Sequence, residues 1–128
     1  DLKLPDMKQE PFSFKKRARS FRYAFNGIRL LISTEHNARI HTVAAVCAVC
    51  AGFIFGISAM EWMVVIILIG IVFAAEAFNS ALEVLADYVS PEYREAIGRA
   101  KDLAAGAVLC VAIAAAITGC VIFLPYIF

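Results

Sequence analysis

Hydrophobic residues gather in three long stretches of this chain. Residues 43–60 and 103–128 carry no charged side chain, and residues 62–86 are apolar apart from Glu76 and Glu83. A helix needs roughly 20 apolar residues to cross a bilayer core of about 30 Å. We therefore predict an all-α integral membrane protein that forms one domain over residues 1–128, with transmembrane helices at residues 38–57, 60–88 and 91–126.

A shorter apolar period precedes the first of these stretches. Between residues 12 and 33, apolar side chains recur at alternating spacings of four and three, and polar side chains repeat the same spacing on the opposite face. The apolar positions are Phe14, Ala18, Phe21, Phe25, Ile28 and Ile32, and the polar ones are Lys15, Arg19, Arg22, Asn26, Arg29 and Ser33. This pattern predicts a basic amphipathic helix that lies in the membrane interface. Its cations either attract anionic headgroups alone or, for a minority of them, bind a phosphate-bearing ligand.

The positive charges predict how the chain is oriented. All twelve Lys and Arg residues lie within residues 3–39 and 94–101, and residues 40–93 contain none. Because Lys and Arg collect on the cytoplasmic side of a membrane, we expect the N-terminus and the loop near residues 88–101 to be cytoplasmic. The turn at residues 57–62 and the C-terminus would then face outward. At the cytoplasmic loop, Ser90 is expected to cap a helix that carries Pro91 in its first turn.

Four cysteines, Cys47, Cys50, Cys110 and Cys120, fall inside the apolar stretches. Cys47 and Cys50 form a C-x-x-C pair, but no second pair completes a zinc site. In such surroundings cysteine behaves as a small, polarizable packing residue. We therefore expect no redox or metal function for these thiols.

Acidic and amide side chains share one face of the second predicted span. Glu76, Asn79, Glu83 and Asp87 follow each other at i, i+3, i+7 and i+11, which places them on the same side of a helix. Ionisable residues within a span are costly and usually point at a partner, a cavity or a reaction site. The alternative is a polar seam that only sets the register of helices in an oligomer.

The start of the third predicted span offers a counterpart to this acidic face. Lys101 lies there between Gly98 and Asp102, and one interpretation is that it simply neutralises a carboxylate of the second span. One lysine cannot neutralise all the acids near this interface, which are Glu35, Glu76, Glu83, Asp87 and Asp102. A divalent cation could do so, and magnesium prefers carboxylate oxygens together with nucleotide phosphates. ATP-dependent phosphoryl transfer is therefore a hypothesis, although the chain has no P-loop and no protein-kinase motif set.

Two sequence runs carry a resemblance to a known family. They are residues 76–83 (EAFNSALE) with Asp87, and residues 98–109 (GRAKDLAAGAVL). Together they closely resemble the prokaryotic diacylglycerol kinase family, and the similarity extends from about Phe14 to Pro125. Residues 34–41 and 57–62 look more like the undecaprenol kinases of this family than the diacylglycerol kinases of enteric bacteria.

The resemblance implies a domain-swapped homotrimer of three-span subunits in the bacterial inner membrane, with active sites shared between neighbouring chains. It also implies ATP- and magnesium-dependent phosphorylation of the primary hydroxyl of a membrane lipid at the cytoplasmic interface. Undecaprenol is the expected acceptor and diacylglycerol the alternative. A hypothesis from another class is a small trimeric channel or ion-binding scaffold, in which the acidic residues line a polar path.

The resemblance further implies a role for particular residues. Glu76 would be the general base, with Lys101 and Asn79 as the other catalytic residues. Glu35 and Glu83 would bind magnesium, and Gly98, Asn79 and Lys101 would contact the phosphates. Arg19, Tyr23, Asp87 and Asp102 would complete the nucleotide site. Lys16 would lie near the lipid entrance, where some members of the family carry an arginine.

Overall fold

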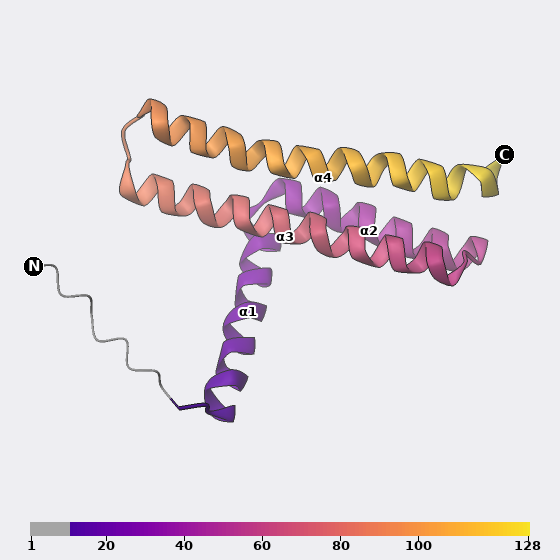
Figure 1. Cartoon of the computed structure of the whole chain (residues 1–128), viewed down its shortest axis with the longest axis horizontal. Helices are drawn as coiled ribbons and strands as arrows, with labels where there is room; N and C mark the ends of the chain where they lie inside the picture. The colour runs from indigo at the N-terminus through magenta and orange to yellow at the C-terminus, as the bar shows by residue number, and fades with distance from the viewer. Residues whose placement is uncertain (1–10) are drawn as a thin grey trace, which may run out of the picture.

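The computed structural model describes residues 11–128 and is helical almost throughout them. The four helices are α1 (Phe14–Thr34), α2 (His36–Phe55), α3 (Ala59–Val89) and α4 (Glu95–Ile127). Helices α2, α3 and α4 run side by side, whereas α1 stands across their common direction where α2 begins (Figure 1). Helices α3 and α4 continue past the beginning of α2 (Figure 1). Residues 1–10, part of the expected cytoplasmic N-terminus, lie outside the described residues.

The three long helices of the bundle have the length and composition of membrane spans. Helices α2, α3 and α4 contain 20, 31 and 33 residues, and each includes an apolar window long enough to cross a bilayer. This confirms the prediction of an all-helical chain with three spanning segments. The protein is thus a multi-pass membrane protein.

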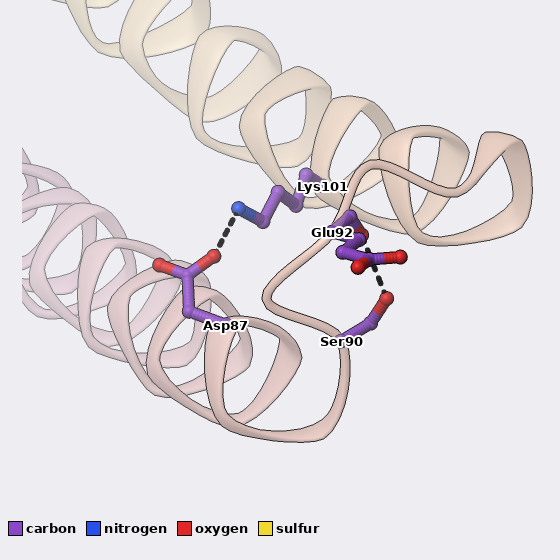
Figure 2. A network of polar contacts seen from close by, with 4 residues as sticks. All are labelled: Asp87, Ser90, Glu92 and Lys101. Atoms are coloured by element: carbon purple, nitrogen blue, oxygen red, sulfur yellow. Dashed lines mark hydrogen bonds and ion pairs between the residues drawn. The ribbon is translucent and has the colours of Figure 1, made fainter.

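The connection between α3 and α4 differs from the prediction. Helix α4 begins at Glu95, four residues after the predicted start at residue 91. The Ser90 hydroxyl donates a hydrogen bond of 2.8 Å to the Glu92 carbonyl oxygen (Figure 2), so it stabilises a turn instead of accepting from a helical N–H. Arg94 is the N-cap residue of α4 and makes no capping bond with its side chain. The expected Ser90 cap with Pro91 in the first turn is therefore wrong.

The junction of α1 and α2 is a single extended residue, Glu35. From the first turn of α2, the Arg39 guanidinium donates to the carbonyl oxygens of Ile32 at 3.0 Å and Ser33 at 2.5 Å. These carbonyls lie in the last turn of α1, where helical partners are missing. Arg39 thus ties the end of α1 to the beginning of α2 and holds the bend that carries Glu35.

The opposite end of the bundle is fixed by polar and aromatic contacts. Ser58 and Glu61 form a reciprocal capping box at the start of α3. The Tyr126 hydroxyl of α4 donates a 2.6 Å hydrogen bond to Glu61 Oε1. The Tyr126 ring also stacks on Phe55 of α2, with ring centroids 5.8 Å apart. The ends of all three spanning helices are therefore held in one arrangement.

Candidate active site

Glu76 is the deepest polar side chain in the described part of the chain. It lies on α3 with 1% of its surface exposed and is the one buried polar or charged residue among residues 11–128. His41 of α2 approaches it, with Nε2 3.0 Å from Glu76 Oε1. Within residues 11–128, this oxygen has no aligned hydrogen-bond donor. The buried Asn79 Oδ1 likewise accepts no hydrogen bond there, and the buried Ser80 Oγ makes none. A group of unsatisfied polar atoms in a membrane helix indicates a reaction or binding site.

Further along α3, the acidic face meets α4. Lys101 Nζ lies 2.5 Å from Asp87 Oδ1, and the two side chains point toward each other across the gap between the helices (Figure 2). The pair is partly exposed, so it contributes little to stability by itself. The pair instead positions Lys101, the one lysine of α4. It holds this lysine on the side of α3 that carries Glu76, Asn79 and Glu83.

The remaining predicted site residues of α4 lie close to this pair in sequence. Gly98 packs against Tyr93, whose ring would come within 3.0 Å of a Cβ atom at that position. A side chain at residue 98 would therefore displace the Tyr93 ring. Asp102 is exposed. The neighbouring Arg99 forms an exposed ion pair of 2.9 Å with Glu95 on the same helix.

The predicted residues of α1 are not buried against this face in the single chain. Lys16, Arg19 and Tyr23 are exposed, and Tyr23 retains 68% of its surface. Glu35 is half-buried at the junction of α1 and α2, and Glu83 is half-buried on α3. The single chain therefore brings Asp87 of α3 together with Lys101 of α4, while Arg19 and Tyr23 of α1 stay exposed.

The site carries carboxylate and amide oxygens that can serve as metal ligands. Among residues 11–128, no three His, Cys, Asp or Glu side chains lie close enough together to form a metal centre by themselves. Magnesium often takes only one or two carboxylates and completes its shell with water and phosphate oxygens. Glu83 and the unpartnered Asn79 Oδ1 are one helical turn apart, so the donor chemistry fits a magnesium ion that arrives with a nucleotide.

An apolar cavity of about 540 Å³ lies between α2, α3 and α4, and His41 is part of its wall. Most of the wall is made of alanine and larger aliphatic or aromatic side chains, such as Ala48, Val72 and Phe123. A cavity of this size and polarity fits an apolar group of small-molecule dimensions. The buried carboxylate of Glu76 and this apolar space therefore share His41 as a common neighbour.

Sequence patterns missed two residues of this site. His41 lies within the run at residues 34–41 and Ser80 within the run at residues 76–83, and no pattern singles out either residue. An imidazole inside an apolar span is unusual enough to signal a partner. The identity of that partner depends on the packing of α2 against α3, which the sequence does not display.

Comparison with known proteins places the chain in a family. Residues 22–123 match the family model described as prokaryotic diacylglycerol kinase. The chain belongs to the prokaryotic diacylglycerol kinase family. The match covers α2 and α3 completely and most of α1 and α4, and it includes Glu76, Lys101 and His41.

Individual members of the prokaryotic diacylglycerol kinase family are similar over most of the chain. The undecaprenol kinase of Bacillus subtilis (strain 168) is 36% identical over 120 residues, which are 94% of this chain and 98% of that protein. The diacylglycerol kinase of Synechocystis sp. is 40% identical over 107 residues, 83% of this chain and 61% of that protein. The diacylglycerol kinase of Escherichia coli (strain K12) is 34% identical over 100 residues, 78% of this chain and 82% of that protein. Both named activities are lipid kinase activities, and membership places this enzyme among the lipid kinases.

Proposed function

We propose that this kinase transfers the γ-phosphoryl group of ATP to the primary hydroxyl of undecaprenol at the cytoplasmic face of the inner membrane. The observation that carries this proposal is the buried Glu76 carboxylate, which has an oxygen without an aligned donor. Its close neighbour His41 lines an apolar cavity. A carboxylate in this position can accept a proton from an alcohol whose long apolar body stays in the membrane. The similarity to the Bacillus subtilis undecaprenol kinase over 94% of the chain supports this acceptor.

In this proposal Glu76 is the general base, and Asn79, Gly98 and Lys101 contact the phosphates. Phosphoryl transfer depends mainly on in-line positioning and on stabilising negative charge on the transferring group. The contact between Lys101 and Asp87 supports this assignment, since it holds the ammonium group between α3 and α4. From there Lys101 can exchange one anionic oxygen of Asp87 for one of a phosphate.

Glu35 and Glu83 would hold magnesium in the proposed site. When bound, the ion neutralises phosphate oxygens and helps to orient the nucleotide. Arg39 supports the role of Glu35, because its two bonds to the last turn of α1 fix the junction at which Glu35 lies. Glu83 follows Asn79 by one helical turn, so the carboxylate can reach the metal ion while the Asn79 side chain contacts the phosphates that this ion binds.

We further propose that the enzyme is a domain-swapped homotrimer in which a neighbouring chain completes the nucleotide site. Arg19, Tyr23 and Asp102 are exposed on the single chain, which leaves them available to such a neighbour. Asp87 would join them in the nucleotide pocket. Helix α1 would lie in the membrane interface, with Lys16 near the lipid entrance.

The acceptor is tested by offering two lipids to the same preparation. Purified enzyme in mixed micelles, supplied with ATP and magnesium, is expected to phosphorylate undecaprenol with a higher kcat/KM than diacylglycerol. Radiolabelled products are separated and counted under identical conditions. The Synechocystis and Escherichia coli relatives are named diacylglycerol kinases, so diacylglycerol is the specific alternative. A higher kcat/KM for diacylglycerol would establish that alternative instead.

The orientation in the membrane gives a second test. A single cysteine added after Phe128, in a variant with its four natural cysteines replaced by alanine, is expected to react with a membrane-impermeant maleimide added outside intact cells. The reason is that Arg94, Arg99 and Lys101 keep the loop between α3 and α4 in the cytoplasm, which puts the far end of α4 outside. A cysteine placed at Glu92, in that loop, is the matched control and should react only after lysis. Labelling of the C-terminal cysteine only after lysis would refute this orientation.

A further inference from the structure

The Glu76 carboxylate needs a partner that the proposed phosphoryl transfer does not supply. It is 1% exposed and lies within a membrane-spanning helix. An ionised carboxylate in such surroundings is strongly disfavoured unless a donor or a positive charge faces it. A general base must be ionised before it can accept a proton, so some side chain has to favour that state.

Lys101 does not meet this need in the single chain. Its ammonium group contacts Asp87, which lies about 16 Å along α3 from Glu76 at the rise of a regular helix. The other polar atoms near Glu76 in sequence, Asn79 Oδ1 and Ser80 Oγ, make no hydrogen bond in the described part of the chain. The lysine therefore belongs to the end of the site where the phosphates are expected, and Glu76 depends on another residue.

His41 is placed to be that residue. It comes from α2, a different helix, and its Nε2 is 3.0 Å from Glu76 Oε1. This is hydrogen-bonding distance, although the N–H is not aligned with the oxygen in the single chain. His41 is also more exposed than Glu76, at 20% against 1% for their side chains. The imidazole is thus the more accessible member of the pair.

We propose that His41 is a positioning residue for Glu76, an inference that rests on the proposed lipid kinase function. The imidazole donates its Nε2 proton to Glu76 Oε1, keeps the carboxylate ionised and leaves Oε2 directed at the acceptor hydroxyl. As the acceptor oxygen bonds to the γ-phosphorus, the bond from that phosphorus to the β,γ-bridging oxygen breaks. The hydroxyl proton moves to Glu76 Oε2 and ADP leaves. Since His41 also lines the apolar cavity, a lipid in that cavity would present its hydroxyl next to this pair.

Two substitutions separate hydrogen-bond donation from packing. His41→Phe keeps a ring but removes the donor, whereas His41→Gln removes the ring but keeps an N–H at a similar distance from the backbone. Loss of a hydrogen bond to a charged group is expected to lower kcat of His41→Phe by about tenfold or more. The KM values for ATP and lipid should stay within about twofold of the parent, and His41→Gln should retain more than about one third of the parental kcat. Thr42→Val is the matched control, because the neighbouring Thr42 hydroxyl donates to the Ala38 carbonyl oxygen of its own helix, and it should leave kcat unchanged.

A double substitution tests whether His41 acts through Glu76. If it does, His41→Phe should lower turnover no further in a protein that already carries Glu76→Gln.

Thermal unfolding in micelles identifies a variant that has lost its fold, and His41→Leu then provides a second donor-free protein. Equal losses in His41→Phe and His41→Gln, a parental kcat in His41→Phe, or a further loss on top of Glu76→Gln would each overturn the proposal. A parent that phosphorylates neither lipid would overturn the proposed function and the role of His41 together. An active parent with an active His41→Phe variant would overturn the role of His41 alone.

Discussion

Glu76→Gln is expected to lower turnover by roughly a hundredfold or more while nucleotide binding survives. The amide keeps the size of the side chain and can still hydrogen bond, but it does not accept the hydroxyl proton. Glu76 is only 1% exposed, so a water molecule from bulk solvent cannot easily take its place as the proton acceptor. Turnover is measured with labelled ATP and lipid in mixed micelles, and nucleotide binding by titration without lipid.

Glu61→Gln is the matched control for this experiment. Glu61 also lies on α3, but in the first turn of the helix, where it accepts hydrogen bonds from the Ser58 N–H and the Tyr126 hydroxyl. It should retain parental turnover per folded molecule. Near-normal turnover of Glu76→Gln would contradict the role of general base and would favour the interpretation of α3 as a polar seam between helices.

The helices could be predicted because each depends on a local pattern. Three apolar stretches and one alternating period fixed the number of helices, and most boundaries lie within two residues of the predicted ones. The exception is the start of α4. A Ser-Pro pair is typical of a helix start, but the Ser90 hydroxyl bonds Glu92 within a turn, so the helix begins only at Glu95. That choice depends on the distance the chain has to span between α3 and α4, which a local pattern does not contain.

The site was predictable along one helix and less so between helices. The spacing of Glu76, Asn79, Glu83 and Asp87 places them on one face of α3 by helix geometry alone. A charge pair between Lys101 and an acid of α3 could be predicted from the sequence, but not that Asp87 would be this acid. The approach of His41 to Glu76 was not predictable in this way, because it joins residues 35 positions apart on separate helices. Such a contact depends on how α2 rotates and slides against α3.

Glu83→Gln is expected to weaken the magnesium-supported binding of ATP by at least about tenfold, in addition to lowering turnover. In the proposed site this carboxylate is one of two that hold the metal, and the metal joins the protein to the phosphates. The amide oxygen is a weaker ligand because it has lost its charge. ATP binding is titrated against magnesium without lipid, so this measurement does not depend on catalysis.

Two other variants are the controls for this titration. Glu76→Gln should show the parental magnesium dependence of ATP binding, because its proposed role begins only when the hydroxyl loses its proton. Glu95→Gln is the control for loss of an acidic charge near the loop between α3 and α4, since Glu95 is exposed and pairs with Arg99 on its own helix. It should bind ATP as the parent does, because an exposed pair of this kind contributes little. If Glu83→Gln also bound ATP with the parental magnesium dependence, Glu83 would not be a metal ligand. The acidic face of α3 would then have to act on the nucleotide through Asp87 and Lys101, whose contact would become the centre of the phosphate site.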